Sequence, residues 1–232
     1  SIGQYCSFLS RKYSPGEYFL PFSSRRFQLP KTLPRTLRGD EIKKLLTVIR
    51  SEYINSPSDY CRRLRTRDLC IIELLFCLGL RIGEICAMNL SDYNSEDNTV
   101  LIHGKGKKER ILFISSQDVI QELKFWLQVR SEMDPQDSAL FISRLGRRMS
   151  IYSIENVFYK YRDMAQINPL STPHFLRHSF ATELLNNGAG IRDVQELMGH
   201  NSIVTTQIYT EVSLMRKKEV LMKYNGRNRI EF

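Results

Sequence analysis

A dense apolar segment at residues 69–80 is the feature that most constrains the fold of this chain. It begins beside Asp68, is interrupted by Glu73, and is shorter than the roughly 18 apolar residues that a membrane span needs. An apolar segment of this kind is buried in a folded protein. We therefore expect a buried helix over residues 67–78 that ends at Gly79, and no membrane partner.

Helical periodicity of apolar residues recurs along most of the chain. Asp40 is expected to cap the first helix of this series. Further helices are expected at residues 82–90, 119–129, 151–166, 174–187, 190–198, 202–208 and 211–222. Residues 99–103 and 110–114 predict a hairpin with a basic, glycine-containing turn, and residues 139–142 predict a third short strand. The expected fold class is mainly α with a small antiparallel β-sheet (α+β).

Charge and proline content divide the chain near Leu37. Lys and Arg number 34 and Asp and Glu 25, so the net charge is 34 − 25 = +9. This excess is typical of proteins with a polyanionic partner such as nucleic acid, and a merely basic protein is the alternative. Prolines and arginines give residues 21–38 the character of an extended linker. We expect residues 38–232 to form the main domain and residues 1–37 to precede it.

The cysteines indicate a reducing environment. All five lack a Cys-x-x-Cys pair, so neither a disulfide framework nor a zinc ribbon is indicated. Cys70, Cys77 and Cys86 lie in or beside apolar segments and are expected to be small buried side chains. Trp126 and Phe175 are expected in the core. The first residues show no secretory leader and the first residue is not Met, which fits a fragment of a cytoplasmic protein.

Two segments carry residue types that suit an anionic centre. Arg81 directly follows the apolar helix and projects from a rigid element; a surface pair with Glu84 is the alternative. His174, Arg177 and His178 have helical spacing that places them on one face, with a fixed cation and a titratable imidazole. An ordinary helix surface or a packed histidine is the alternative, and we expect His178 to pack or bond within its helix.

A third segment holds a histidine and a tyrosine. His200 and Tyr209 lie nine residues apart (209 − 200) across a glycine break. Most tyrosines are packing residues with a polar tip, which is the alternative for Tyr209. The pair His174 and His178 lacks the Glu of the metalloprotease helix and a nearby third ligand. We therefore expect no zinc site at this pair, and the sequence shows no P-loop or acidic metal cluster that would indicate a cofactor.

Six residues, taken in order, resemble the catalytic set of the tyrosine recombinases, also called the phage integrase family. They are Arg81 in Gly-Leu-Arg-Ile-Gly-Glu, Lys105 in Gly-Lys-Gly-Lys-Lys-Glu-Arg, His174 and Arg177 in His-Phe-Leu-Arg-His-Ser, His200 in Met-Gly-His, and Tyr209 in Thr-Thr-Gln-Ile-Tyr-Thr. Each motif alone is weak, but the ordered set is specific. The resemblance covers about residues 39–222 and is closest to Xer-type and mobile-element integrases.

The resemblance implies a site-specific recombinase that acts on double-stranded DNA without metal or ATP. The two arginines would hold the scissile phosphate, and His200 would add a hydrogen bond. Tyr209 would attack the phosphorus and form a 3′-phosphotyrosyl link. His174 would serve as base or orienter, and Lys105 would protonate the leaving 5′-oxygen as general acid.

Further basic residues are expected to contact DNA phosphates without reading the sequence. They are Lys107, Lys108, Arg110, Arg62 and Arg63. For the last two, a solvated charged face is the alternative. The basic tail at residues 212–232 either docks on a neighbouring subunit, as family tails often do, or forms a solvated helix with a frayed end.

The resemblance also implies a homotetramer on DNA and allows a monomer away from it. Residues 1–37 resemble the end of a core-binding domain with its linker, and residues 38–232 the catalytic domain. Integration or excision of a mobile element is the expected role, since Glu211 stands where Xer-type proteins often carry His after the tyrosine. Xer-type chromosome dimer resolution, a type IB topoisomerase-like activity and a non-cutting DNA-binding accessory factor are the alternatives. The complete set of six residues argues against the last.

Overall fold

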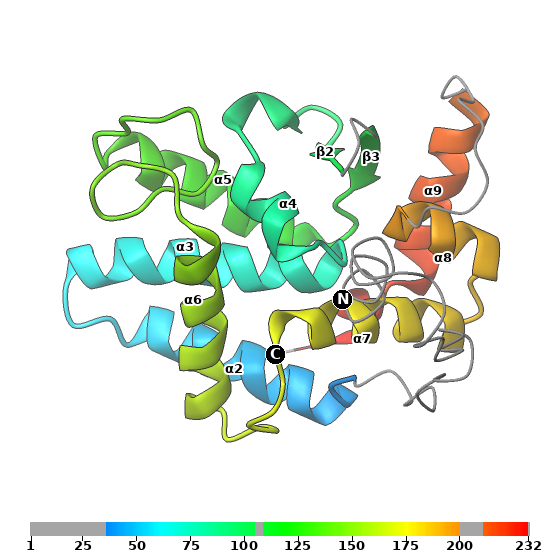
Figure 1. Ribbon diagram of the computed structural model, residues 1–232, viewed down its shortest axis with the longest axis horizontal. Helices are drawn as coiled ribbons and strands as arrows, with labels where there is room; N and C mark the ends of the chain where they lie inside the picture. The colour runs from blue at the N-terminus through cyan, green and yellow to red at the C-terminus, as the bar shows by residue number, and fades with distance from the viewer. Residues whose placement is uncertain (1–35, 105–108, 200–210, 232) are drawn as a thin grey trace, which may run out of the picture. The chain divides into compact units, whose positions relative to one another are not determined.

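The computed structural model describes residues 36–104, 109–199 and 211–231, with the backbone alone at 211–216. These residues belong to one unit, Arg35–Phe232, in which helices predominate (Figure 1). Its elements are α2 (Gly39–Ile54), α3 (Asp59–Cys77), α4 (Ile82–Ala87), η2 (Leu90–Asp92), β1 (Tyr93–Asn94), β2 (Thr99–His103), β3 (Glu109–Phe113), α5 (Gln117–Ser131), α6 (Ile151–Met164), α7 (Pro173–Asn186), α8 (Ile191–Met198), α9 (Glu211–Tyr224) and η3 (Gly226–Arg229). The expected fold class, mainly α with a small antiparallel sheet, is confirmed. Within the described ranges no helix has the length and apolar character needed to cross a membrane.

Helix α3 is the central element of the fold. Every side chain from 66 to 77 is buried, and α2, α5 and α7 all pack against this helix (Figure 1). Ser58 caps its N-terminus, because the Ser58 hydroxyl accepts a hydrogen bond from the backbone N–H of Cys61 at 3.2 Å. The helix therefore begins at Asp59 rather than at residue 67, and the prediction covered only its buried second half.

Gly79 fixes the way in which α3 ends. Its backbone is left-handed, with φ of +59°. A Cβ atom at this position would lie 2.3 Å from the ring of Phe180 on α7. Glycine is therefore required both by the backbone angle and by the close approach of α7. The chain then turns into α4, whose N-cap is Arg81.

The sheet has the strand order β1-β2-β3, and both strand pairs are antiparallel. Strands β2 and β3 pair in register from Thr99 with Phe113 to His103 with Glu109. The predicted hairpin is confirmed, with β3 beginning one residue earlier than expected. Inward-facing apolar residues of β2 and β3 join the core, so the sheet extends the helical core rather than forming one of its own.

Residues 139–142 do not form the third strand that we expected; β1 has that place in the sheet. The carbonyl of Leu140 accepts a hydrogen bond from Trp126 Nε1 at 3.0 Å. The carbonyl of Ala139 accepts one from Arg130 Nε at 2.9 Å. Side chains of α5 thus bind two carbonyl groups that a neighbouring strand would otherwise bind. The segment keeps only isolated bridges, between Ala139 and Asn89 and between Ile142 and Arg148.

The other expected helices lie within a few residues of their predicted positions, except that segment 82–90 divides into α4 and the 3-10 turn η2. The expected helix at 202–208 lies outside the described residues. Trp126 and Phe175 are buried as expected. Cys70 and Cys77 are also buried, whereas Cys86 is only half-buried.

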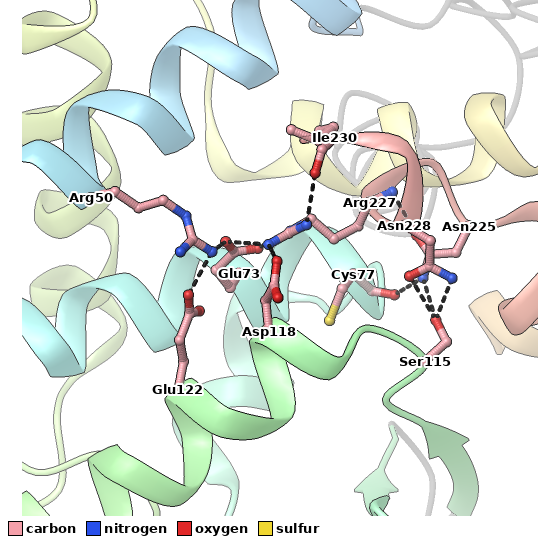
Figure 2. Close-up of polar contacts among 10 residues, drawn as sticks. All are labelled: Arg50, Glu73, Cys77, Ser115, Asp118, Glu122, Asn225, Arg227, Asn228 and Ile230. Carbon is pink, nitrogen blue, oxygen red and sulfur yellow. Dashed lines mark hydrogen bonds and ion pairs between the residues drawn. The ribbon is translucent and has the colours of Figure 1, made fainter. Parts of the chain in front are cut away.

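The C-terminal segment packs on its own chain. Val220 of α9 is buried in the core. Beyond the helix, Asn225 Nδ2 donates to the carbonyl of Cys77 at 2.8 Å, and Arg227 Nε donates to Glu73 Oε2 at 2.7 Å (Figure 2). The Arg227 side chain is 1% exposed. These described residues of the tail are therefore packed on this chain and do not form a solvated end.

Glu73 is the centre of a buried ionic cluster that joins α2, α3, α5 and the tail (Figure 2). It accepts hydrogen bonds from Arg50 at 2.8 Å and from Arg227. Arg50 also pairs with Glu122 of α5, and Arg227 lies 3.4 Å from Asp118. Burial and the charge of Glu73 raise the pKa of Glu122 to about 7, in spite of the attraction of Arg50.

The ionised form of Glu122 is expected to weaken the fold above neutral pH. Because its pKa is higher in the folded chain, the stability that protonated Glu122 contributes is present at low pH and is lost as pH rises through 7. We expect Glu122→Gln to be more stable than wild type at pH 8 by about 1–3 kcal/mol, and equal to it near pH 5. Urea unfolding across this pH range measures the difference. Glu132→Gln, an exposed change at the end of the same helix, is the control, and a Glu122→Gln chain that is less stable at pH 8 contradicts the expectation.

Candidate active site

Three elements far apart in the sequence, α4, β3 and α7, meet at one carboxylate, that of Glu84 in α4. Glu84 Oε1 accepts hydrogen bonds from Arg81 Nη1 at 2.8 Å and from Arg110 Nη1 at 2.9 Å. Glu84 Oε2 accepts from the backbone N–H of Arg81 at 2.8 Å and from Arg110 Nη2 at 2.9 Å. Arg177 Nη1 on α7 lies 3.9 Å from the same oxygen. A single acidic group therefore holds three arginines together.

The charge balance of this arginine cluster is positive. Burial alone would raise the pKa of Glu84, but the hydrogen bonds and charge of Arg110 and the bonds from Arg81 lower it to about 2. Glu84 is therefore ionised at neutral pH and offsets only one of the three guanidinium charges. The excess suits a bound anion, and the Arg81 side chain, which is 39% exposed, is the open side of the cluster.

Arg177 is the most constrained of the three arginines. Its side chain is 4% exposed. Its Nη1 donates to the carbonyl of Gly79, and its Nη2 donates to the carbonyl of Met198 at the end of α8. Burial and the neighbouring charge of Arg81 lower the pKa of Arg177 to about 10, so it stays charged at neutral pH. Arg177 thus fixes the C-terminal ends of α3 and α8 around one planar cation.

Arg110 does not lie on the surface, as we expected for a residue that contacts DNA phosphates. It is buried, and both of its Nη groups donate hydrogen bonds to Glu84. Its Nε donates to the carbonyl of Leu197 at 3.0 Å. Gly199, the left-handed residue after α8, leaves room for it, since a Cβ there would lie 3.1 Å from Arg110 Nη1. Arg110 therefore links β3 to α4 and α8.

His174 and His178 are exposed on α7, with ring centroids 6.1 Å apart. All three residues lie on α7 at the predicted helical spacing, but Arg177 is buried whereas the two histidines are exposed. Burial and the charges of His174 and Arg177 lower the pKa of His178. His178 is exposed, and among the described residues its ring contact is with His174 of the same helix.

The remaining predicted residues are either distant or not described. Lys105, Lys107, Lys108, His200 and Tyr209 lie outside the described residues. Arg62 is exposed, and Arg63 pairs with Glu132 at 2.9 Å. Both lie in the first turn of α3, roughly 20 Å of helix from its other end, so the structure does not bring them to Arg81.

Two members of the cluster were missed by the sequence prediction. Glu84 was considered only as a surface partner of Arg81, and that pair is present but belongs to a larger network. Arg110 had a usable signal. Arg110 and the buried Leu112 are two residues apart in β3, and alternate residues of a strand point to the same face. The alternation therefore indicates that Arg110 lies on the inner face. In the described part of the chain, no group of three or more His, Cys, Asp or Glu side chains could hold a metal ion.

The family model described as "Phage integrase family" matches residues 35–216. The chain belongs to this family. Among similar proteins, a "Tyrosine recombinase" of Agathobacter rectalis is 37% identical over 206 residues, covering 89% of this chain and 67% of its own length. A "Tyrosine recombinase XerC" of Shewanella amazonensis is 41% identical over 199 residues, covering 84% of this chain and 62% of its own length. This phage integrase family chain thus spans about three fifths to two thirds of these relatives.

Solved structures of recombinases have the same fold. The crystal structure of XerA recombinase superposes with a TM-score of 0.63 at 28% identity, covering 100% of this chain and 83% of its own. A XerH recombinase bound to a palindromic difH substrate gives a TM-score of 0.71 at 21% identity, covering 98% and 63%. At 21% identity, the similarity to the XerH recombinase concerns the fold alone.

Replacing the central carboxylate of the cluster is expected to weaken the fold. In Glu84→Gln the three arginines lose their counter-charge, and we expect the free energy of unfolding at pH 7 to fall by about 2–3 kcal/mol. Because the folded pKa of Glu84 is depressed to about 2, this contribution is present above pH 4.5 and is lost as pH falls toward 2. Urea unfolding at pH 7 and pH 3 measures it, with the exposed Glu96→Gln as control. A loss below 0.5 kcal/mol at pH 7 would show that Glu84 does not hold the cluster together.

Proposed function

We propose that this chain is the catalytic part of a site-specific DNA recombinase that uses a tyrosine nucleophile. The observation that carries the proposal is the arginine cluster around Glu84 in a chain of the phage integrase family. A scissile phosphate carries negative charge, which increases in the transition state of phosphoryl transfer. Preorganised cations in a partly buried site stabilise that added charge more than water does.

Each residue of the proposed site has a distinct task. Arg81 and Arg177 hold the non-bridging oxygens of the phosphate. Tyr209 attacks phosphorus, so an O–P bond to tyrosine forms and the bond to the 5′-oxygen breaks. The phenol proton passes to His174, and Lys105 gives a proton to the 5′-oxygen. His200 adds a hydrogen bond to the phosphate, as the family resemblance implies.

The intermediate determines what the reaction needs. A 3′-phosphotyrosyl ester keeps the energy of the broken phosphodiester, so rejoining needs neither ATP nor a metal ion. Attack by the 5′-hydroxyl of another strand gives recombination, whereas attack by the original strand only reseals the DNA. We propose that the protein acts in the cytoplasm, and that residues 1–37 are the end of a core-binding domain and residues 38–232 the catalytic domain.

Double-stranded DNA is the proposed substrate, and a tetramer is the proposed active assembly. Among the structural neighbours, a λ integrase dimer is bound to a core site and a λ integrase tetramer to a Holliday junction. Lys107, Lys108, Arg62 and Arg63 are proposed phosphate contacts, whereas Arg110 is assigned to the arginine cluster. A basic net charge of +9 supports this partner.

We further propose that the biological role is integration or excision of a mobile element. The support is Glu211, which stands where Xer-type proteins often carry His. Chromosome dimer resolution is the second candidate, and relatives at 37–41% identity carry the name XerC. The two roles differ in where the DNA site lies on the chromosome.

Covalent trapping tests the proposed chemistry. We expect full-length protein, incubated with randomly nicked genomic DNA of its source organism, to form a denaturant-resistant adduct at the 3′ end of cleaved strands. Tyr209→Phe is expected to bind DNA and form none, whereas Tyr152→Phe, which changes a tyrosine that is 71% exposed, matches wild type. Sequencing the trapped DNA identifies the site and separates a mobile-element end from a dimer-resolution site. Intact DNA binding without any adduct would instead support a non-cutting DNA-binding factor.

A further inference from the structure

The carboxylate of Glu84 has a complete set of hydrogen bonds. A carboxylate offers about four lone-pair sites on its two oxygens. Arg110 fills two of them, since its Nη1 donates to Oε1 and its Nη2 to Oε2, both at 2.9 Å. The Nη1 group and the backbone N–H of Arg81 fill the other two, both at 2.8 Å. Glu84 therefore has no acceptor site left for a further donor.

The residue that binds both oxygens of Glu84 through its side chain is Arg110, not Arg81. Arg110 and Glu84 are both buried, and Arg110 Nε also donates to the carbonyl of Leu197, which fixes the plane of this guanidinium. Arg81 lies on the open side of the cluster and binds Glu84 with only one side-chain group, Nη1. Among the described residues, Arg81 Nε and Nη2 donate no hydrogen bond. These two groups are therefore open to an anion.

Removal of Arg110 would change how Arg81 binds Glu84. Arginine and carboxylate pair most strongly when two N–H donors meet the two oxygens side by side. Arg81 is the N-cap of α4 and Glu84 is in the first turn, so one donor of the Arg81 fork is already on Oε1. With the Arg110 bonds gone, a rotation of the fork would bring a second donor onto the vacated sites. A guanidinium paired in this way has fewer donors and less uncompensated charge for a phosphate.

We propose that Arg110 is a positioning residue of the recombination reaction, which saturates both oxygens of Glu84 and so keeps the Arg81 fork directed to the scissile phosphate. Arg110 acts through Glu84 and does not itself touch the DNA, in agreement with its burial. This inference rests on the proposed function, in which Arg81 holds a non-bridging oxygen of the phosphate.

The charge of the substrate separates positioning of Arg81 from general stability. In a methylphosphonate, a methyl group replaces one non-bridging oxygen, so the linkage at the cleavage site is neutral. A cation that stabilises this oxygen speeds cleavage of the phosphate and has much less effect on the methylphosphonate. The experiment measures single-turnover cleavage, by full-length protein at pH 7, of two duplexes that carry the DNA site identified by trapping, one with each linkage. It is run at a temperature at which urea unfolding shows the variants to be folded.

Arg110→Met is expected to cleave the phosphate duplex about tenfold or more slowly than wild type, and the methylphosphonate duplex within about threefold of wild type on that duplex. Arg81→Ala is expected to show the same pattern. Arg110→Lys keeps the buried charge but has one donor group in place of two, so its phosphate rate is expected between those of wild type and Arg110→Met. Equal losses of Arg110→Met on both duplexes, or no loss on either, would overturn the inference. If Arg110→Met does not fold, a wild-type phosphate rate of Arg110→Lys overturns it, and a loss on phosphate alone supports it.

Arg148→Met is the matched control. Arg148 donates to the carbonyls of Cys86 and Met88 at the end of α4, and within the described ranges it makes no bond to Glu84. Its removal therefore disturbs the same helix without opening the oxygens of the carboxylate. We expect the ratio of the two cleavage rates to equal that of wild type. A loss on phosphate alone in this variant would show that any disturbance of α4 gives the pattern, and would also overturn the inference.

A double variant shows whether Arg110 acts through Glu84. Glu84→Gln with Arg110→Met removes one charge of each sign, so the net charge of the cluster is kept. Without a carboxylate to draw Arg81 away, Arg110→Met is expected to slow phosphate cleavage by less than about twofold in the Glu84→Gln background. A tenfold loss there would mean that Arg110 acts independently of Glu84, contrary to the inference. This comparison needs the phosphate duplex alone, so it also decides the case in which wild type leaves the methylphosphonate uncut.

Arg81→Ala shows which proposal has failed if the result is negative. A loss on phosphate alone in this variant, without the same pattern in Arg110→Met, leaves Arg81 on the phosphate and refutes the role of Arg110 only. Equal losses of Arg81→Ala on both duplexes refute the contact of Arg81 with the phosphate, and the positioning role of Arg110 falls with it. A wild type that cleaves neither duplex refutes the proposed function itself.

Discussion

The fold around the site depends on the ion pairs of one buried carboxylate with three guanidinium groups. Without Glu84, the charges of Arg81, Arg110 and Arg177 would repel one another in a region of low dielectric constant. Without the arginines, burial would raise the pKa of Glu84 above its ordinary value. The carboxylate thus reduces the repulsion among the three guanidinium groups, and the guanidinium groups stabilise the ionised form of the carboxylate. Because its members come from the α3–α4 turn, β3 and α7, the interaction also sets where these elements lie relative to one another.

Backbone carbonyls also accept hydrogen bonds from two arginines of the cluster. The last carbonyls of α8, those of Leu197 and Met198, accept from Arg110 and Arg177. They are groups that a helix end leaves without an internal partner. The arginines therefore serve as caps for α8, and both Nη groups of Arg110 also donate to Glu84. Gly79 contributes in the same way, since its close contact with Phe180 places its carbonyl beside Arg177.

Local patterns in the sequence predicted the parts of the structure that depend on near neighbours. The buried half of α3, the strand β2 and the pair of Arg81 with Glu84 all follow from spacing along the chain. Contacts between distant segments left no such pattern. Arg110 and Glu84 are 26 residues apart, and Arg227 and Glu73 are 154 apart. The strand expected at 139–142 is absent because side chains of α5 bind the backbone of this segment.

The contact between Arg227 and Glu73 also has a consequence for the order of folding. It closes a loop that contains the whole arginine cluster, so it is among the most non-local contacts of the chain. Helix α3 is synthesised early, but its central carboxylate lacks this partner until residue 227 has been made. Until then, Arg50 of α2 is the cation that pairs with Glu73. The 3-10 turn η3 thus completes the buried ionic cluster around Glu73 of α3.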